Sequence, residues 1–152
     1  MKYRRLPEYV MAKQLISPYL AGASSANVEA SANATNPVID GYDGAMFVLN
    51  LGLMPEDDTL DVAIEWASSG SATDLAEITA ATDAFFAQMD TDSSSNVFLL
   101  NLDFRMAGMD KGVIGAGATV SDTDIVYSVT AFLYGGTRRV PVTQDQTIVY
   151  AG

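Results

Sequence analysis

Residues 38–54 read Val-Ile-Asp-Gly-Tyr-Asp-Gly-Ala-Met-Phe-Val-Leu-Asn-Leu-Gly-Leu-Met. The pairs Asp40-Gly41 and Asp43-Gly44 are typical of turns, because aspartate hydrogen-bonds the nearby backbone and glycine accepts a positive φ. The apolar run that follows, residues 45–51, has the length of a strand and ends at Gly52. Because apolar residues occupy both of its alternating faces, we expect this strand inside a sheet rather than at its edge.

Two further stretches alternate between apolar and polar residues, which is the period of a strand with one face in water. In residues 60–66 the polar positions include Asp61 and Glu65, and Trp66 is most simply a core residue at the end of the strand. Residues 97–105 follow the same pattern. Their expected inward positions are Phe98, Leu100, Leu102 and Phe104.

The last third of the chain predicts more strands. Residues 125–134 are apolar on both faces and are expected to form a second central strand. Residues 112–120 predict a strand in which Gly115 and Gly117 indicate a bulge or a close approach of another part of the chain. Two short strands are then expected, at residues 140–142 and 147–150.

One stretch has a helical period instead. Apolar residues recur at helical spacing over residues 74–88, and Asp74 with Glu77 supplies a capping pattern, so we predict a short helix there. The rest of the chain contains about six or seven short strands separated by turn signals, with no alternation of strand and helix. The sequence therefore predicts an all-β fold with minor α content, an antiparallel β-sandwich or jelly-roll-like barrel with one short helix.

The N-terminal segment differs from the rest in composition. Its basic residues are Lys2, Arg4, Arg5 and Lys13, and they lie among aromatic and aliphatic residues. Residues 21–36, rich in Ala, Ser and Asn, are typical of an extended connector. We therefore expect an extended arm and linker at residues 1–37 and a β-sandwich domain at residues 38–152. The alternative is that the arm packs on its own domain as an edge strand.

The composition excludes several classes of function. The chain has 152 residues, 49% of them hydrophobic and 18% charged, which suits one globular domain. It contains no cysteine and no histidine, so it has no disulfides, no usual zinc, copper or haem ligands, and no Ser-His or Cys-His nucleophile pair. We expect no cofactor, no bound metal and no enzymatic activity.

The charge distribution also limits the partners. The net charge is -11, and no basic residue occurs between Lys13 and Arg105. Such an acidic body repels phosphate backbones, so we expect no nucleic-acid partner. The longest apolar run near the N-terminus, residues 9–12, is too short for a signal peptide, and no stretch is long enough to span a membrane.

Acidic residues form two incomplete site patterns. Oxygen-bearing side chains at every second position resemble the start of a calcium-binding loop: Asp90, Asp92, Ser94 and Asn96. The glycine and glutamate that such a loop requires are replaced by Ser95 and Asn101, so a polar loop is favoured. Asp61 and Glu65 share the wet face of one strand, but no other feature of a catalytic site accompanies them.

Four motifs follow one another in a particular order between residues 38 and 142. They are Ile39-Asp40-Gly41-Tyr42 leading into residues 45–52, the acidic alternating strand at residues 60–65, the late strand ending Phe132-Leu133-Tyr134-Gly135-Gly136, and Val140-Pro141-Val142. In this order and spacing the chain resembles the capsid decoration, or cement, proteins encoded among the head genes of tailed bacteriophages.

The resemblance implies a β-sandwich on the outer surface of the virion capsid, commonly a homotrimer at or near three-fold positions, which holds neighbouring subunits of the major capsid protein together. The arm then supplies the expected capsid-contact residues, which are Lys2, Tyr3, Arg4, Arg5, Tyr9, Met11, Lys13 and Tyr19. Two alternatives remain. The first is that the protein has the same fold but is a tail or spike component of a virion. The second is that it is a carbohydrate-binding jelly-roll module, which requires exposed aromatics beside carboxylates.

Overall fold

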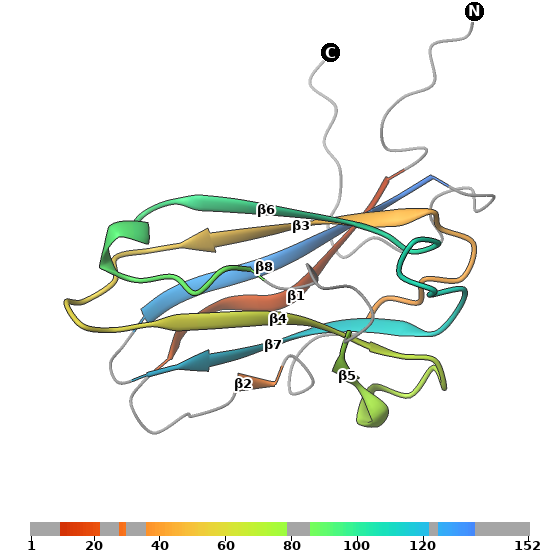
Figure 1. Ribbon diagram of the computed structural model, residues 1–152, viewed down its shortest axis with the longest axis horizontal. Helices are drawn as coiled ribbons and strands as arrows, with labels where there is room; N and C mark the ends of the chain where they lie inside the picture. Colours follow the sequence, from red (N-terminus) through yellow and green to blue (C-terminus); the bar gives the residue numbers. More distant parts are fainter. Residues whose placement is uncertain (1–9, 22–27, 30–35, 79–85, 122–124, 136–152) are drawn as a thin grey trace, which may run out of the picture.

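The computed structural model describes residues 10–21, 28–29, 36–78, 86–121 and 125–135, and these residues form a β-sandwich (Figure 1). The described elements, in chain order, are β1 (Val10–Ala21), β2 (Val28–Glu29), β3 (Gly44–Leu51), β4 (Leu60–Ala67), the 3-10 helix η3 (Ala72–Asp74), β5 (Ala76–Glu77), the 3-10 helix η4 (Thr91–Ser93), β6 (Val97–Asp103), β7 (Val113–Val120) and β8 (Ile125–Tyr134).

The strands form two four-stranded sheets, with the orders β1-β8-β3-β6 and β2-β7-β4-β5. The pairing is nested: β1 pairs with β8, β2 with β7, β3 with β6 and β4 with β5, always antiparallel. The nested pairs together form one long antiparallel hairpin. This hairpin is folded so that β3 also pairs with β8, and β4 also pairs with β7. Eight antiparallel strands connected in this way form a jelly roll, so the predicted all-β sandwich is confirmed.

The core lies between the two sheets. β3 and β8 occupy the central positions of their sheet, as their two-sided apolar sequences predict. Their inward side chains, among them Phe47 and Val129, are completely buried. β4 contributes Leu60, Val62 and Ile64 from the opposite sheet, as its alternation predicts. Half-buried Trp66 packs against this core.

The N-terminal segment requires a correction. Val10–Ala21 is not an extended arm but the edge strand β1, paired with β8 from Val10 opposite Tyr134 to Ala21 opposite Ile125. Met11, Leu15 and Ile16 are buried in the core. The open side of β8 needs hydrogen-bond partners, and these apolar side chains gain by leaving water, so this part of residues 1–37 belongs to the sandwich. The alternative of an edge strand is the one the structure shows here.

The helix prediction is wrong for the described residues of the stretch 74–88. Asp74 ends the 3-10 helix η3, and the residues after it run extended along β4. The backbone N–H groups of Ile78 and Phe86 donate to the carbonyl oxygens of Ile64 and Val62, at 3.4 and 3.0 Å. The open edge of β4 thus supplies partners that outweigh the local helical preference of this alanine-rich sequence. Residues 79–85 lie outside the described part.

Glycines act where the chain crowds or turns. Asp40-Gly41 forms the predicted turn, with Gly41 at a φ of 81° and the Asp40 carboxylate accepting from the N–H of Gly112 at 2.8 Å. Gly115 and Gly117 mark close approaches, since side chains lie directly over both, and the register of β4 with β7 is continuous. The strands predicted at residues 140–142 and 147–150 lie outside the described residues.

Candidate assembly surface

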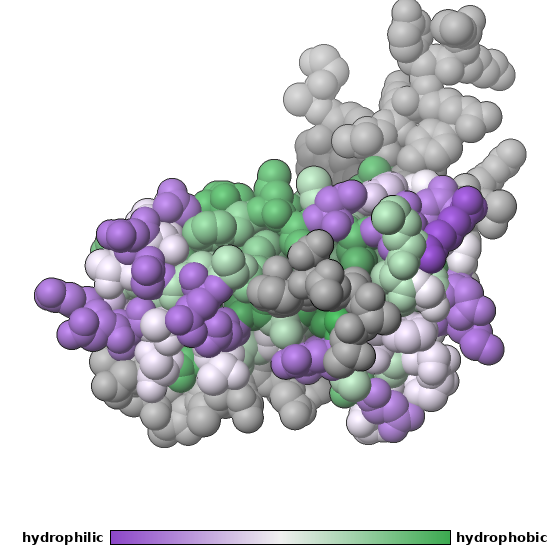
Figure 2. All heavy atoms as spheres, viewed as in Figure 1, coloured by the Kyte–Doolittle hydropathy of each residue, from purple (hydrophilic) through white to green (hydrophobic). Residues whose placement is uncertain are grey.

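The outer face of the sheet β1-β8-β3-β6 carries a patch of apolar side chains. Because alternate residues of each strand are buried in the core, their neighbours face outward. We name five of these outward residues the apolar face: Met46, Val48, Val97, Leu99 and Phe132. Figure 2 shows hydrophobic side chains gathered over β6 and β3, with hydrophilic residues toward both ends of the molecule.

The register of the strands places these side chains opposite one another across neighbouring strands. Val48 lies opposite Leu99 on one side, and Met46 lies opposite Phe132 on the other. Val97 and Leu99 on the edge strand β6 are 60% and 65% exposed, while the other three are half-buried by their neighbours. A contiguous apolar patch at the surface is a candidate site of contact with another molecule.

The surroundings of the apolar face are polar but almost uncharged. Asn50, Asn101 and Ser128 face outward between or beside its members, and the Tyr134 hydroxyl donates to the Asn101 side-chain oxygen at 2.8 Å. Among the described outward positions of β3, β6 and β8, only Asp103 carries a charge. An apolar centre with an uncharged polar border has the composition of a protein interface rather than of a face that stays in water.

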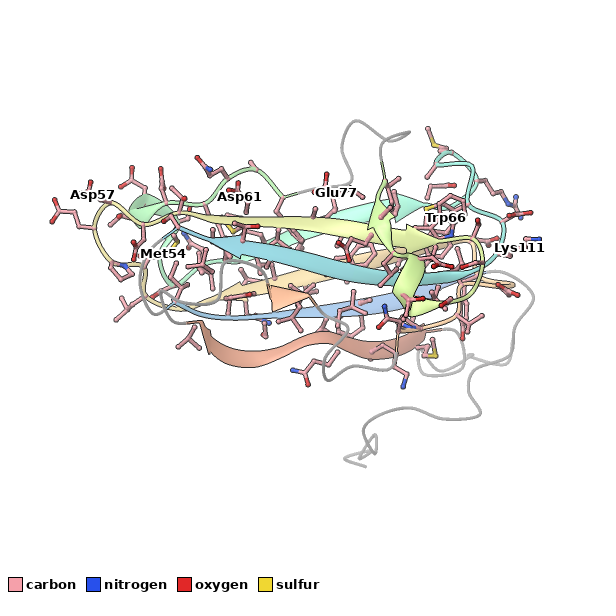
Figure 3. All side chains as sticks on the ribbon, turned by 90° about the horizontal axis from the view of Figure 1, so that it is seen from below. Met54, Asp57, Asp61, Trp66, Glu77 and Lys111 are labelled. Atoms are coloured by element: carbon pink, nitrogen blue, oxygen red, sulfur yellow. The ribbon has the colours of Figure 1, made fainter. Side chains whose placement is uncertain are left out.

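The opposite outer face has the reverse chemistry. Asp61 and Glu65 of β4 and Glu77 of β5 all point outward from the sheet β2-β7-β4-β5, and we name these three residues the acidic face. Figure 3 shows Asp61 and Glu77 on the same side of the sandwich. No lysine or arginine occupies a described outward position of β4, β5 or β7. The two faces of one sandwich therefore differ sharply in polarity.

None of the capsid-contact residues expected from the sequence is a member of the apolar face. Met11 requires a correction: it is 9% exposed, and its sulfur accepts a hydrogen bond from the Tyr42 hydroxyl at 3.6 Å, so it packs inside its own domain. Lys13 is half-buried on β1, opposite Ala131. The backbone of Tyr19 belongs to β1, but its side chain lies outside the described part. The remaining expected contacts, Lys2, Tyr3, Arg4, Arg5 and Tyr9, also lie outside it.

In both incomplete acidic patterns, the one at residues 90–96 and the one on β4, side-chain oxygens accept hydrogen bonds from other groups of the protein. The Asp90 carboxylate caps η4, accepting from the N–H of Asp92 at 3.1 Å, while the Ser94 hydroxyl accepts from the N–H of Met54 at 2.9 Å. Asp61 accepts from the amide of Gln88 at 3.0 Å. The loop at residues 90–96 thus uses its oxygens to join two turns of the chain.

One hollow of about 320 Å³ lies beside Trp66, between the end of β4 and β5. Asp74 and Glu77 are among its lining residues, and Trp66 is the only aromatic residue in its described lining. The indole N–H of Trp66 donates to the carbonyl oxygen of Lys111 at 2.9 Å. A single aromatic, fixed by such a bond, differs from the aromatic cluster that a carbohydrate-binding module requires. Among the described helices, none is long and apolar enough to cross a membrane.

One stretch of the sequence, residues 97–100, indicates the apolar face. Residues 97–100 read Val-Phe-Leu-Leu, so both faces of this segment are apolar. The alternation predicts that Phe98 and Leu100 face inward, and both pack against the core. The outward pair, Val97 and Leu99, is unusual because β6 is an edge strand, whereas the rule that holds for β3 and β8 would place a segment with two apolar faces inside the sheet.

Comparisons with known proteins find likeness in structure but not in sequence. No protein-family model matches the chain, and no curated protein matches it. A chain in the structure of infectious bursal disease virus Gt strain matches with a TM-score of 0.52 and 12% identity, covering 86% of this chain and 34% of that one. The likeness is one of fold.

A second match is to the crystal structure of an infectious bursal disease virus VP2 subviral particle, with a TM-score of 0.51 and 13% identity, covering 84% of this chain and 33% of that one. Both matched chains are viral capsid proteins. The present chain spans about a third of the length of each. The jelly roll described above is therefore a fold that viral capsid proteins also have.

Proposed function

We propose that this chain is a virion structural protein, a decoration or cement protein that binds the outer surface of a viral capsid and stabilises contacts between subunits of the major capsid protein. The observation that carries the proposal is the opposition of the two outer faces. A protein that lies on a larger surface needs one face suited to contact and another suited to water, and this sandwich has both.

The apolar face supplies the adhesion in this proposal. Burial of apolar surface contributes about 25 cal/mol per Å², before the costs of ordering and desolvation are subtracted. Leu99 and Val97 are largely exposed, so most of their surface is still available for burial. The scarcity of charge on this face matters equally, because an unpaired charge buried at an interface would offset much of that gain.

The acidic face suits the side exposed to solvent. Its carboxylates keep their hydration when the opposite face is covered, and their charge keeps neighbouring bound copies from stacking on one another. The fold supports the assignment to a virion, since the structures matched above are capsid proteins. Adhesion of this kind requires no catalytic group.

The basic residues that precede β1 have a separate place in the proposal. Lys2, Arg4 and Arg5 carry most of the positive charge of the first half of the chain. We assign them, with Tyr3 and Tyr9, to contacts with acidic groups on the shell, which would steer the otherwise acidic protein toward it. Removal of residues 1–9 should then slow association at low salt more than it speeds release.

A matched pair of variants tests the role of the apolar face. Leu99→Asp places a charge within it, and Leu53→Asp makes the same change at an exposed leucine in the β3–β4 loop, where 78% of the residue is accessible. Because a charge buried without a partner costs about 3–5 kcal/mol, L99D should bind purified capsid shells at least about 100-fold more weakly, as measured by co-sedimentation. Binding by L53D should match the wild type. Equal binding by both variants would contradict the proposal.

A further inference from the structure

The four edge strands of the sandwich differ in how they are protected. Exposed strand edges invite pairing with other chains, and proteins blunt them with short strands, bulges, lysine or proline. β2 and β5 are each two residues long. β1 contains Lys13 and Pro18, and its register with β8 shifts at two places. Three of these four described edges are therefore blunted.

The fourth edge, β6, has none of these devices. Its seven residues pair with β3 in continuous register, without a bulge, and contain neither proline nor lysine. Its outward side chains include the exposed Val97 and Leu99. A long, regular, apolar edge is a template for another strand.

The hydrogen bonds show which backbone groups of β6 face the open edge. The N–H of Phe104 donates to the carbonyl oxygen of Asp43, and the N–H of Leu51 donates to that of Asn96, each at 3.0 Å. Because bonded and non-bonded pairs alternate along an antiparallel ladder, the even-numbered residues of β6 bond to β3. The odd-numbered residues, Val97, Leu99, Asn101 and Asp103, then direct their N–H and C=O groups away from it. Within the described part of the chain, no strand lies on that side.

We infer that the partner of this edge is β6 of a second copy of the chain, paired antiparallel about a two-fold axis. Self-pairing of one strand gives an interface in which each copy contributes the same residues. A register centred on Leu100 pairs all seven residues and sets each Asp103 opposite Val97 of the other copy, so the two carboxylates stay apart. The acidic face lies on the other sheet, so two copies of charge -11 meet where their charges are sparse.

This dimer has a consequence for the outer surfaces. A two-fold axis perpendicular to the sheet keeps both apolar faces on one side and joins them across the β6–β6 seam. The acidic faces lie together on the opposite side. The dimer therefore doubles the apolar surface offered to a capsid. It needs no capsid in order to form, so the inference does not depend on the proposed function.

Two variants of one residue test the backbone pairing. Asn101→Pro removes an N–H that points to the open edge, whereas Asn101→Ala keeps that N–H; both lose the hydrogen bond from Tyr134. In sedimentation equilibrium the wild type and N101A should dimerise, and N101P should dimerise at least about ten-fold more weakly, because two hydrogen bonds are lost by symmetry. Circular dichroism of both variants serves as the control for folding. A wild type that stays monomeric or forms trimers, or equal dimerisation by N101P and N101A, would overturn the inference.

A cysteine crosslink tests the register, and the chain offers a clean background because it contains no cysteine. Leu100 would face its own copy at a non-hydrogen-bonded pair, where Cα atoms are about 4.5 Å apart, a separation that a disulfide accepts. Under mild oxidation Leu100→Cys should form covalent dimers rapidly. Leu53→Cys, at the exposed loop leucine, should remain mostly monomeric under denaturing electrophoresis. Equal crosslinking of the two would overturn the inference even if N101P does not fold.

Discussion

The carboxylate of Glu65 lies over Gly117 of β7, on the side of β4 away from Glu77, its cross-strand neighbour on β5. Glu65 and Glu77 are directly opposite in an antiparallel pair, a position where two like charges repel. The absence of a side chain at Gly117 gives Glu65 room to lean away. The glycine pattern of β7 and the acidity of β4 are thus linked on one face.

Replacement of Glu77 by lysine should stabilise the fold. Glu77→Lys converts the repulsion with Glu65 into an attraction, worth about 0.2–1 kcal/mol across a strand pair. The free energy of unfolding, measured with urea, should rise by that amount. Glu56→Lys makes the same change of charge at an exposed turn residue and serves as the control. If both variants gain equally, the effect comes from net charge and not from the pair.

Two glycine substitutions should differ in sign or size. A Cβ at Gly44 would lie 2.6 Å from the carbonyl oxygen of Leu102, which belongs to the backbone and cannot move freely. Gly44→Ala should therefore destabilise the fold by about 1–3 kcal/mol. A Cβ at Gly117 would meet the end of the flexible Glu65 side chain at 2.8 Å, so Gly117→Ala should change stability by less than about 1 kcal/mol. Thermal unfolding of both variants checks the order.

Phe86 should prove important to the sandwich. It is 7% exposed, and its N–H bonds to β4. Phe86→Ala should cost about 3–5 kcal/mol of unfolding free energy, since it leaves a cavity in the core. Gln88→Ala, two residues away on the exposed side, should cost less than about 1 kcal/mol. A small loss from F86A would mean that this segment does not pack along β4.

The ion pair between Arg105 and Asp43 should matter little. Their side chains meet at 3.1 Å, but 84% of the arginine side chain is exposed, so water and salt screen the attraction. Arg105→Gln should lower the unfolding free energy by at most about 1 kcal/mol in low salt, and the difference should vanish in high salt. A larger, salt-independent loss would indicate that Arg105 has a packing role instead.

The sequence predicts the centre of this fold better than its edges. Apolar residues occur on both faces of β3 and β8, a property contained in the strand itself, and this pattern predicts their central positions. β1 was not predictable in this way, because its placement depends on the open side of β8, which is more than a hundred residues away in the chain. The described residues after Asp74 are not helical for the same reason, since the edge of β4 and not local preference decides their conformation.

The place of the candidate surface was not predictable from the sequence. Composition excluded the usual catalytic and metal-binding residues, the family resemblance implied adhesion to a capsid, and the expected contacts lay in the N-terminal segment. The structure instead brings together Met46, Val48, Leu99 and Phe132 from three strands that are far apart in sequence. Their proximity depends on the strand topology. Met11, which was expected among the contacts, is buried in the core instead.

Electron cryomicroscopy of virus particles that carry this protein tests the central claim most directly. The account predicts density for the sandwich on the outer surface of the head, with the sheet β1-β8-β3-β6 toward the major capsid protein and Glu65 and Glu77 toward solvent. Density at the tail, or a sandwich bound with its acidic face against the shell, would contradict it.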